Sequence, residues 1–222
     1  MVAIDGPSGA GKSTIARRLA SRLGFTYIDT GAMYRAVALW ASRQSVDLSD
    51  MHRAEQLALA AQIELAPAGR ILLNGEDVTE AIRTTEMSND ASKISAISGV
   101  RRAMVAKQRA IGEVASVVME GRDIGTVVFP AADVKVFLDA SPAERVRRRH
   151  LELAAKGQNI SEEQLAAEMR ERDQRDSTRA DAPLSQAPDA VYFDSSGMGI
   201  EEVEEAILKI VRARVTNGKE IV

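Results

Sequence analysis

Short apolar runs alternate along the chain with longer stretches in which apolar residues recur every three or four positions. The first run, at residues 1–5, ends at a glycine-rich turn and predicts a short buried strand. The next stretch keeps its apolar side chains on one face of a helix, which Gly24 ends. Further strands are predicted at 25–29, 116–119, 133–138 and 190–193, and helices at 12–23, 31–43, 50–61, 84–96, 99–113, 142–156, 161–178 and 200–215.

This rhythm is interrupted between residues 62 and 78. Three short β-prone runs, at 62–66, 70–74 and 76–78, are separated there by turn residues. Strands that alternate with helices elsewhere indicate a parallel sheet covered on both faces. We therefore predict an α/β protein with a three-layer fold, a five-stranded parallel sheet and a small inserted β-rich subdomain at about 62–83. Without a linker or repeat, residues 1–222 are expected to form a single domain.

Composition narrows the class of protein without identifying it. The 222 residues are 45% hydrophobic and 27% charged, as expected for a globular chain, and the net charge is only −3. The absence of cysteine excludes disulfides, thiolate zinc sites and a cysteine nucleophile. No apolar run reaches the roughly 18 residues that span a bilayer, and no signal peptide is apparent. We expect a monomeric cytoplasmic protein that binds neither membranes nor nucleic acid.

A phosphate-binding motif occupies the turn between the first strand and the first helix. Residues 6–13 match the pattern G-x(4)-G-K-[ST] in full, and the alternative is a turn that only caps the helix. Glycines let backbone N–H groups turn toward phosphate oxygens, and the helix N-terminus adds partial positive charge. Lys12 is expected to act on the β- and γ-phosphates as a catalytic residue, and the Ser13 hydroxyl to bind Mg²⁺. The predicted nucleotide-binding residues are Gly6, Pro7, Ser8, Gly9, Ala10, Gly11, Lys12, Ser13 and Thr14.

The motif indicates a nucleoside triphosphate and leaves the reaction open. A regulatory GTPase would need an Asn-Lys-x-Asp element to read guanine, and the sequence has none. A motor ATPase would usually be larger and would carry an apolar run ending in paired acids. A small-molecule kinase fits better, provided that a second pocket accepts an anionic substrate. A kinase for another monophosphate or for shikimate, and an ATP-dependent binding module, remain alternatives.

Three segments could build that second pocket. Residues 29–35 and 120–126 each follow a predicted strand, and ligands of parallel α/β sheets bind at the carboxyl ends of strands. In the third segment, residues 170–179, Arg172, Asp176 and Arg179 would share one face of a helix. Each segment also has a simpler interpretation, namely a helix cap, an Arg–Asp pair in a surface turn and a solvated helix face.

A basic run lies in the helix predicted at 142–156. Arg145, Arg148 and Arg149 are spaced to cluster, as in a lid that neutralises the charge of a transferring phosphoryl group. Arg148 is the predicted catalytic member, and residues 142–160 are the predicted lid. A nucleic-acid patch is the competing interpretation, and the lack of interleaved aromatic residues argues against it.

Together these motifs resemble the bacterial cytidylate kinase family of nucleoside monophosphate kinases. The resemblance extends from Ile4 to about Ser195, and several ordered blocks are far more specific than the phosphate-binding motif alone. It implies transfer of the γ-phosphate of ATP, with Mg²⁺, to CMP or dCMP. The blocks that carry it are residues 4–14, 29–35, 75–83, 121–130, 137–140 and 171–184.

The resemblance also implies site residues. Glu120 stands where many relatives have Asp and would hold a magnesium-bound water, and Thr30 stands where many have Ser. No general base is expected, because a phosphate acceptor already carries an ionised oxygen. Arg35 and Arg122 would hold the CMP phosphate with Arg179 near the transferring group, Ser92, Arg101 and Asp123 would read cytosine, and Thr30, Arg172 and Asp176 would surround the sugar. Tyr34 completes the predicted substrate-binding residues, and Arg122 and Arg179 are also predicted to be catalytic.

Overall fold

A five-stranded parallel sheet organises the terminal parts of the chain. In the computed structural model, which describes residues 1–216, the strands lie in the order β2-β6-β1-β7-β8. β1 pairs on both sides, with Ile4 opposite Glu120 on β6 and Val136 on β7. This central position explains why β1 is an uninterrupted buried apolar run before its last residue. The strands are β1 (Val2–Asp5), β2 (Thr26–Asp29), β6 (Val117–Gly121), β7 (Val134–Asp139) and β8 (Val191–Asp194).

The chain forms two compact units. The first consists of Met1–Tyr27, Ala115–Thr178 and the described residues from Ala182 onward. The second consists of Ile28–Val114 with Arg179–Asp181. Each unit has an apolar core of its own.

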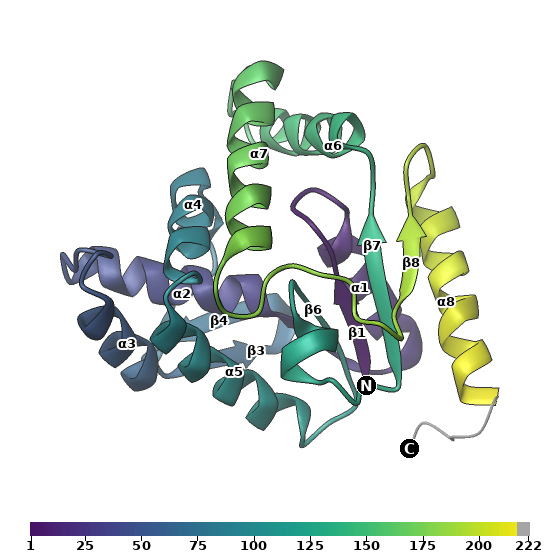
Figure 1. Cartoon of the computed structure of the whole chain (residues 1–222), viewed down its shortest axis with the longest axis horizontal. Coiled ribbons are helices and arrows are strands. Elements are labelled where there is room, and N and C mark those ends of the chain that lie inside the picture. Colours follow the sequence, from purple (N-terminus) through teal and green to yellow (C-terminus); the bar gives the residue numbers. More distant parts are fainter. Residues whose placement is uncertain (217–222) are drawn as a thin grey trace. The chain divides into compact units, whose positions relative to one another are not determined.

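In the first unit, helices α1 (Lys12–Leu23) and α8 (Ile200–Thr216) contact each other beside the sheet (Figure 1). Ile15 and Leu19 of α1 and Ile207 of α8 are buried against the sheet's apolar side chains. At the edge of this core the buried Glu204 carboxylate accepts from Arg18 and Arg22 of α1. Apolar burial and these ion pairs together stabilise the helix pair.

A second helix pair of the first unit consists of α6 (Pro142–Ala155) and α7 (Glu162–Thr178), which pack through Leu153, Leu165 and Met169 (Figure 1). The sequence predicted that Arg179 continues the face of Arg172 and Asp176, and this is wrong, because α7 ends at Thr178. The chain then folds back, so that the Leu184 N–H donates to the Asp176 carbonyl at 2.7 Å.

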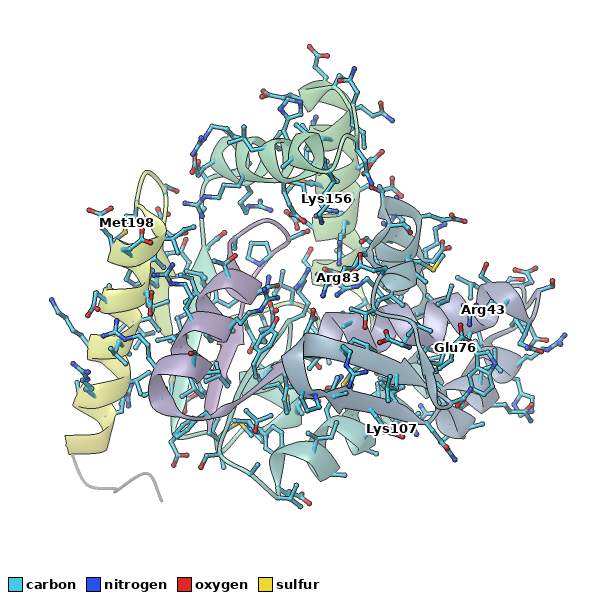
Figure 2. All side chains as sticks on the ribbon, turned by 180° about the vertical axis from the view of Figure 1, so that it is seen from behind. Arg43, Glu76, Arg83, Lys107, Lys156 and Met198 are labelled. Carbon is cyan, nitrogen blue, oxygen red and sulfur yellow. The ribbon has the colours of Figure 1, made fainter. Side chains whose placement is uncertain are left out.

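The second unit combines helices with a separate antiparallel sheet. Arg43 at the end of α2 forms two hydrogen bonds with Glu76 of β5, at 2.7 and 3.0 Å, and Figure 2 shows the two side chains meeting. The sheet order is β3-β4-β5. The helices and strands of the second unit are α2 (Thr30–Arg43), α3 (Met51–Ala60), β3 (Ile63–Ala66), β4 (Arg70–Leu73), β5 (Glu76–Asp77), α4 (Thr85–Ile94) and α5 (Ser98–Gly112).

The predicted fold class is confirmed. The chain is a three-layer α/β protein with a five-stranded parallel sheet and a small three-stranded β-sheet within the region where the β-rich insert was predicted. Every predicted helix and strand is present to within a few residues. The sequence did not reveal the short turns of helix at Pro67–Gly69 and Ala81–Arg83, nor the π-helical turn η3 at Ile124–Val128.

Candidate active site

The phosphate-binding loop connects β1 to α1, as the motif predicted. Gly6 and Gly9 have φ values of 147° and 77°, in the region that favours glycine. A Cβ atom on Gly6 would lie 2.0 Å from the Leu138 carbonyl oxygen, and one on Gly9 would lie 3.0 Å from that of Arg145. The loop therefore needs glycine at both positions, for its conformation and for its close approach to neighbouring backbone.

Lys12, the first residue of α1, is buried at the centre of this loop. Its Nζ atom donates to the Pro7 carbonyl oxygen at 2.6 Å. Burial lowers the pKa of Lys12 to about 7, and the nearby Arg122 guanidinium contributes in the same direction, with opposing effects from Glu120 and Asp5. The two acidic neighbours therefore do not fully offset the effects of burial and of the arginines on the Lys12 ammonium. An added anion would favour its charged form.

The arginines of α6 are divided among separate partners. Arg145 is buried and donates to the Ser8 carbonyl at 3.0 Å and to Asp173 at 2.6 Å. Arg148 donates to the Ser195 carbonyl at 2.7 Å and to the Ala10 carbonyl at 3.5 Å. These two therefore contact the phosphate-binding loop. Arg149 instead pairs with Glu152 on its own helix at 2.7 Å, so the predicted three-arginine cluster is wrong as a single group.

The segment after β6 carries buried charge. Glu120 accepts from the Tyr27 hydroxyl at 2.6 Å, and Arg122 donates from Nε to Asp176 at 2.9 Å. Burial lowers the pKa of Arg122, but the Asp176 carboxylate more than offsets it and holds that pKa above its ordinary value. Asp123 is only 5% exposed. An Arg–Asp pair in a surface turn is therefore excluded, because Asp123 is buried and Arg122 pairs with α7.

The face of α7 that bears Arg172 and Asp176 is not simply solvated. Asp176 is 4% exposed and holds Arg122, and Arg172 lies close enough to Lys12 to lower its pKa. The exposed ion pair between Arg175 and Glu171 lies on a different face. The first unit thus brings together the predicted residues Lys12, Glu120, Arg122, Arg172 and Asp176.

In the second unit, the start of α2 holds a cap and an ion pair. Asp29 accepts from the Ala32 N–H at 2.8 Å, which confirms that it caps the helix. The other carboxylate oxygen of Asp29 accepts from Arg35 at 2.9 Å, so Arg35 is held rather than solvated. Thr30 follows the cap and is buried.

A second group of predicted residues meets around Ser95. The Arg101 guanidinium carbon lies 5.9 Å from the centre of the Tyr34 ring, and the guanidinium donates to the Ser95 carbonyl at 3.2 Å. The Ser95 hydroxyl in turn donates to the Ser92 carbonyl. Tyr34, Ser92 and Arg101 are therefore neighbours although 67 residues of sequence separate the first from the last. Arg179 also belongs to this unit.

Three acidic or aromatic side chains that support the site were not predicted from the sequence. Tyr27 fixes Glu120, Asp173 fixes Arg145, and Asp5 accepts from two backbone N–H groups of the segment after β6. Asp5 and Tyr27 stand at or near the carboxyl ends of β1 and β2, which is the one signal that could have identified them.

Among residues 1–216, no three His, Cys, Asp or Glu side chains lie together in a group that could hold a metal ion on its own. Mg²⁺ bound with a nucleotide needs only one or two protein oxygens, because phosphates and waters supply the rest. The exposed Ser13 hydroxyl and the Glu120 carboxylate beside Lys12 offer such oxygens. This set of donors fits the predicted ion.

No helix among the described residues is long and apolar enough to cross a membrane. Solved structures that the fold resembles include that of an uncharacterized protein from Eubacterium ventriosum ATCC 27560. The TM-score is 0.54 at 11% identity, over 96% of this chain and 97% of that one. At that identity the likeness concerns the fold alone.

Sequence comparison identifies the family. The family model described as cytidylate kinase matches residues 2–213. The cytidylate kinase of Solibacter usitatus (strain Ellin6076) is 76% identical over 222 residues, which cover 99% of this chain and 95% of that protein. The cytidylate kinase of Pelotomaculum thermopropionicum is 50% identical, over 98% of this chain and 96% of that protein. The chain therefore belongs to the cytidylate kinase family, whose members are ATP-dependent nucleoside monophosphate kinases.

Proposed function

We propose that this chain transfers the γ-phosphoryl group of ATP to CMP and dCMP, and releases ADP with CDP or dCDP. One observation carries the proposal beyond family membership. Three cations, those of Lys12, Arg122 and Arg172, lie near one another in the first unit, and the pKa of Lys12 falls to about 7 as a result of burial and of its arginine neighbours. Burial and the arginine neighbours disfavour the charged form of Lys12 even though carboxylates lie nearby, and phosphate oxygens bound at this loop would favour it.

ATP is the co-substrate, and its phosphates are assigned to the loop from Gly6 to Ser13. Backbone N–H groups of the loop and the N-terminus of α1 would hold the phosphate oxygens. Lys12 would exchange its bond to the Pro7 carbonyl for bonds to the β- and γ-phosphates. Ser13 and Glu120 would hold Mg²⁺, Glu120 through a water, and the ion would neutralise phosphate charge when bound.

The acceptor nucleotide is assigned residue by residue. Asp123 and the group around Ser95 would read the cytosine edge, and Arg35 and Arg122 would hold the phosphate. The part-buried Arg122–Asp176 pair supports an acceptor role for this part of α7, because it joins α7 to the segment after β6 and is largely shielded from solvent. The assigned acceptor residues are Thr30, Tyr34, Arg35, Ser92, Arg101, Arg122, Asp123, Arg172, Asp176 and Arg179.

We further assign residues 142–160 to a lid and 62–83 to a subdomain on the CMP side. The contacts of Arg145 and Arg148 with the Ser8 and Ala10 carbonyls support the lid, because they bring α6 to the phosphate-binding loop. Closure would let Arg148 turn to the phosphates. The small sheet β3-β4-β5, joined to α2 through Arg43 and Glu76, supports the subdomain.

Phosphoryl transfer requires mainly that the two reacting phosphate groups be aligned and that their negative charge be neutralised. The attacking oxygen belongs to the phosphate of CMP and is already ionised, so no side chain has to remove a proton from it. Phosphoryl transfer has a loose transition state with charge on the equatorial oxygens. Lys12, Arg122, Arg148 and Arg179 would stabilise that charge.

The acceptor can be tested with purified protein, ATP and a panel of CMP, dCMP, UMP, AMP and GMP in a coupled assay for ADP. We expect kcat/KM to be highest for CMP, followed by dCMP. Lys107 is a partly exposed lysine of α5 that, like Lys12, donates to a backbone carbonyl, that of Leu59 at 3.1 Å, so Lys107→Ala is the matched control for Lys12→Ala. Equal activity with all five monophosphates, or none with CMP, would contradict the proposal. A monomeric state and a cytoplasmic location stay predictions.

A further inference from the structure

Asp5, the last residue of β1, holds a backbone segment 120 residues further along the chain. Its Oδ1 atom accepts from the N–H of Ile124 at 2.8 Å, and its Oδ2 atom accepts from the N–H of Gly125 at 2.7 Å. The side chain is only 5% exposed, so water does not compete for these bonds. Asp5 is directly followed by Gly6, the first residue of the phosphate-binding loop.

The far side of the same segment is also fixed. A Cβ atom on Gly125 would lie 3.1 Å from the Cδ atom of Lys135 and 3.4 Å from Oδ2 of Asp5. Lys135 is itself held by Asp189 at 2.8 Å and by the Pro130 carbonyl. Gly125 therefore fits between the Asp5 carboxylate and the lysine stem with little space to spare.

An ionised carboxylate suits this role better than other side chains. Burial raises the pKa of Asp5 to about 6, the like charge of Asp123 contributes to the rise, and the two N–H donors and Lys12 oppose it. Asp5 is thus ionised at the pH of a kinase assay near 7.5, with acceptor capacity on both oxygens. An asparagine offers one acceptor oxygen, and its NH₂ group would face the second N–H donor.

We propose that Asp5 is a positioning residue for the acceptor, which fixes the Gly121–Gly125 segment, and with it Arg122 and Asp123, to the strand that enters the phosphate-binding loop. The inference rests on the proposed function, which assigns Arg122 and Asp123 to the acceptor nucleotide. Asp5 itself touches no substrate in this account. Its effect is to keep the segment that holds the acceptor in register with the loop that holds ATP.

The consequence is a selective change in the kinetics. Without the carboxylate, Ile124 and Gly125 lose their shared acceptor, and the two side chains just before them lose their alignment. Because a misplacement of about 1 Å can cost on the order of a hundredfold in rate, even a small shift would be measurable. Binding of ATP relies on backbone N–H groups of another loop and should change less.

The test compares Asp5→Asn with Glu204→Gln, a matched control in which a buried carboxylate that joins α8 to α1 loses its charge. We expect Asp5→Asn to raise the KM for CMP at least about tenfold and to lower the ratio of kcat/KM for CMP over UMP. The KM for ATP should change less than about threefold. Glu204→Gln should lower the thermal midpoint without changing either KM. Unchanged CMP kinetics in Asp5→Asn, or the same changes in Glu204→Gln, would overturn the proposal.

Two further measurements keep the inference separate from folding and from the proposed function. Amide hydrogen exchange should become faster at Ile124 and Gly125 in Asp5→Asn, and not in Glu204→Gln. Gly125→Ala, which crowds the same contact, should reproduce the rise in the KM for CMP. If the wild-type protein fails to use CMP, the proposed function is refuted. Unchanged exchange at these two amides refutes the positioning role, whatever the substrate.

Discussion

Binding of ATP should make the protein take up a proton, because Lys12 is uncharged in part of the free molecules at neutral pH. Burial, and then Arg122, lower the pKa of Lys12 to about 7 in the free protein. At pH 8 only about one tenth of the molecules would carry the charged ammonium, and at pH 6 about nine tenths would. Phosphate oxygens within hydrogen-bond reach favour the charged form.

The magnitude follows from these fractions. If the bound lysine is fully charged, uptake should be about 0.9 proton per ATP at pH 8 and about 0.1 at pH 6. Isothermal titration of ATP and Mg²⁺ without acceptor, in buffers of different ionisation enthalpy, measures this number directly. Lys12→Arg is the control, because a guanidinium stays charged throughout this range. Equal uptake in wild type and Lys12→Arg at pH 8, or none in wild type, would refute the reasoning.

Three further perturbations test other parts of the site. Asp123→Ala should reduce the preference for CMP over UMP by about 1–3 kcal/mol in kcat/KM, and an unchanged ratio would mean that Asp123 does not read the base. Asp176→Ala leaves the part-buried Arg122 without its partner, so it should lower the free energy of unfolding by about 2 kcal/mol and raise the KM for CMP more than that for dCMP. Equal effects on the two substrates would contradict a contact with the ribose. Because the folded-state pKa of Asp5 is raised from 3.8 to about 6, folding stability is lost as the pH rises through this window. The free energy of unfolding of Asp5→Asn minus that of wild type, measured in urea, should therefore rise by about 1 kcal/mol between pH 5 and pH 7. A fall in this difference would contradict the raised pKa.

The sequence predicted those features that depend on local chemistry. The phosphate-binding loop needs glycine at fixed positions, and the helices carry their own periodicity and caps, as at Asp29 and Gly24. The order of elements was therefore predictable, including the small sheet. The family resemblance then supplied roles that no local pattern contains.

Contacts between distant parts of the chain were not predictable in this way. The bonds from Asp5 to the segment after β6 depend on the register of β1 against β6, which spacing along one strand does not reveal. The spacing of Arg145 and Arg149 predicted that the two side chains would act together, but each pairs with a different acid, Asp173 and Glu152 respectively. Arg179 lies beyond the last residue of α7, where a contact between distant positions, the bond from the Leu184 N–H to the Asp176 carbonyl, turns the chain back.

In the proposed reaction, Lys12 and its loop move the terminal phosphate of ATP onto CMP. The most direct measurement follows the label from γ-³²P-ATP in the presence of CMP, with products separated by chromatography. We expect labelled CDP from the wild type and from Lys107→Ala, and almost none from a folded Lys12→Ala. Label that appears only as inorganic phosphate, or labelled CDP formed equally well by Lys12→Ala, would contradict it.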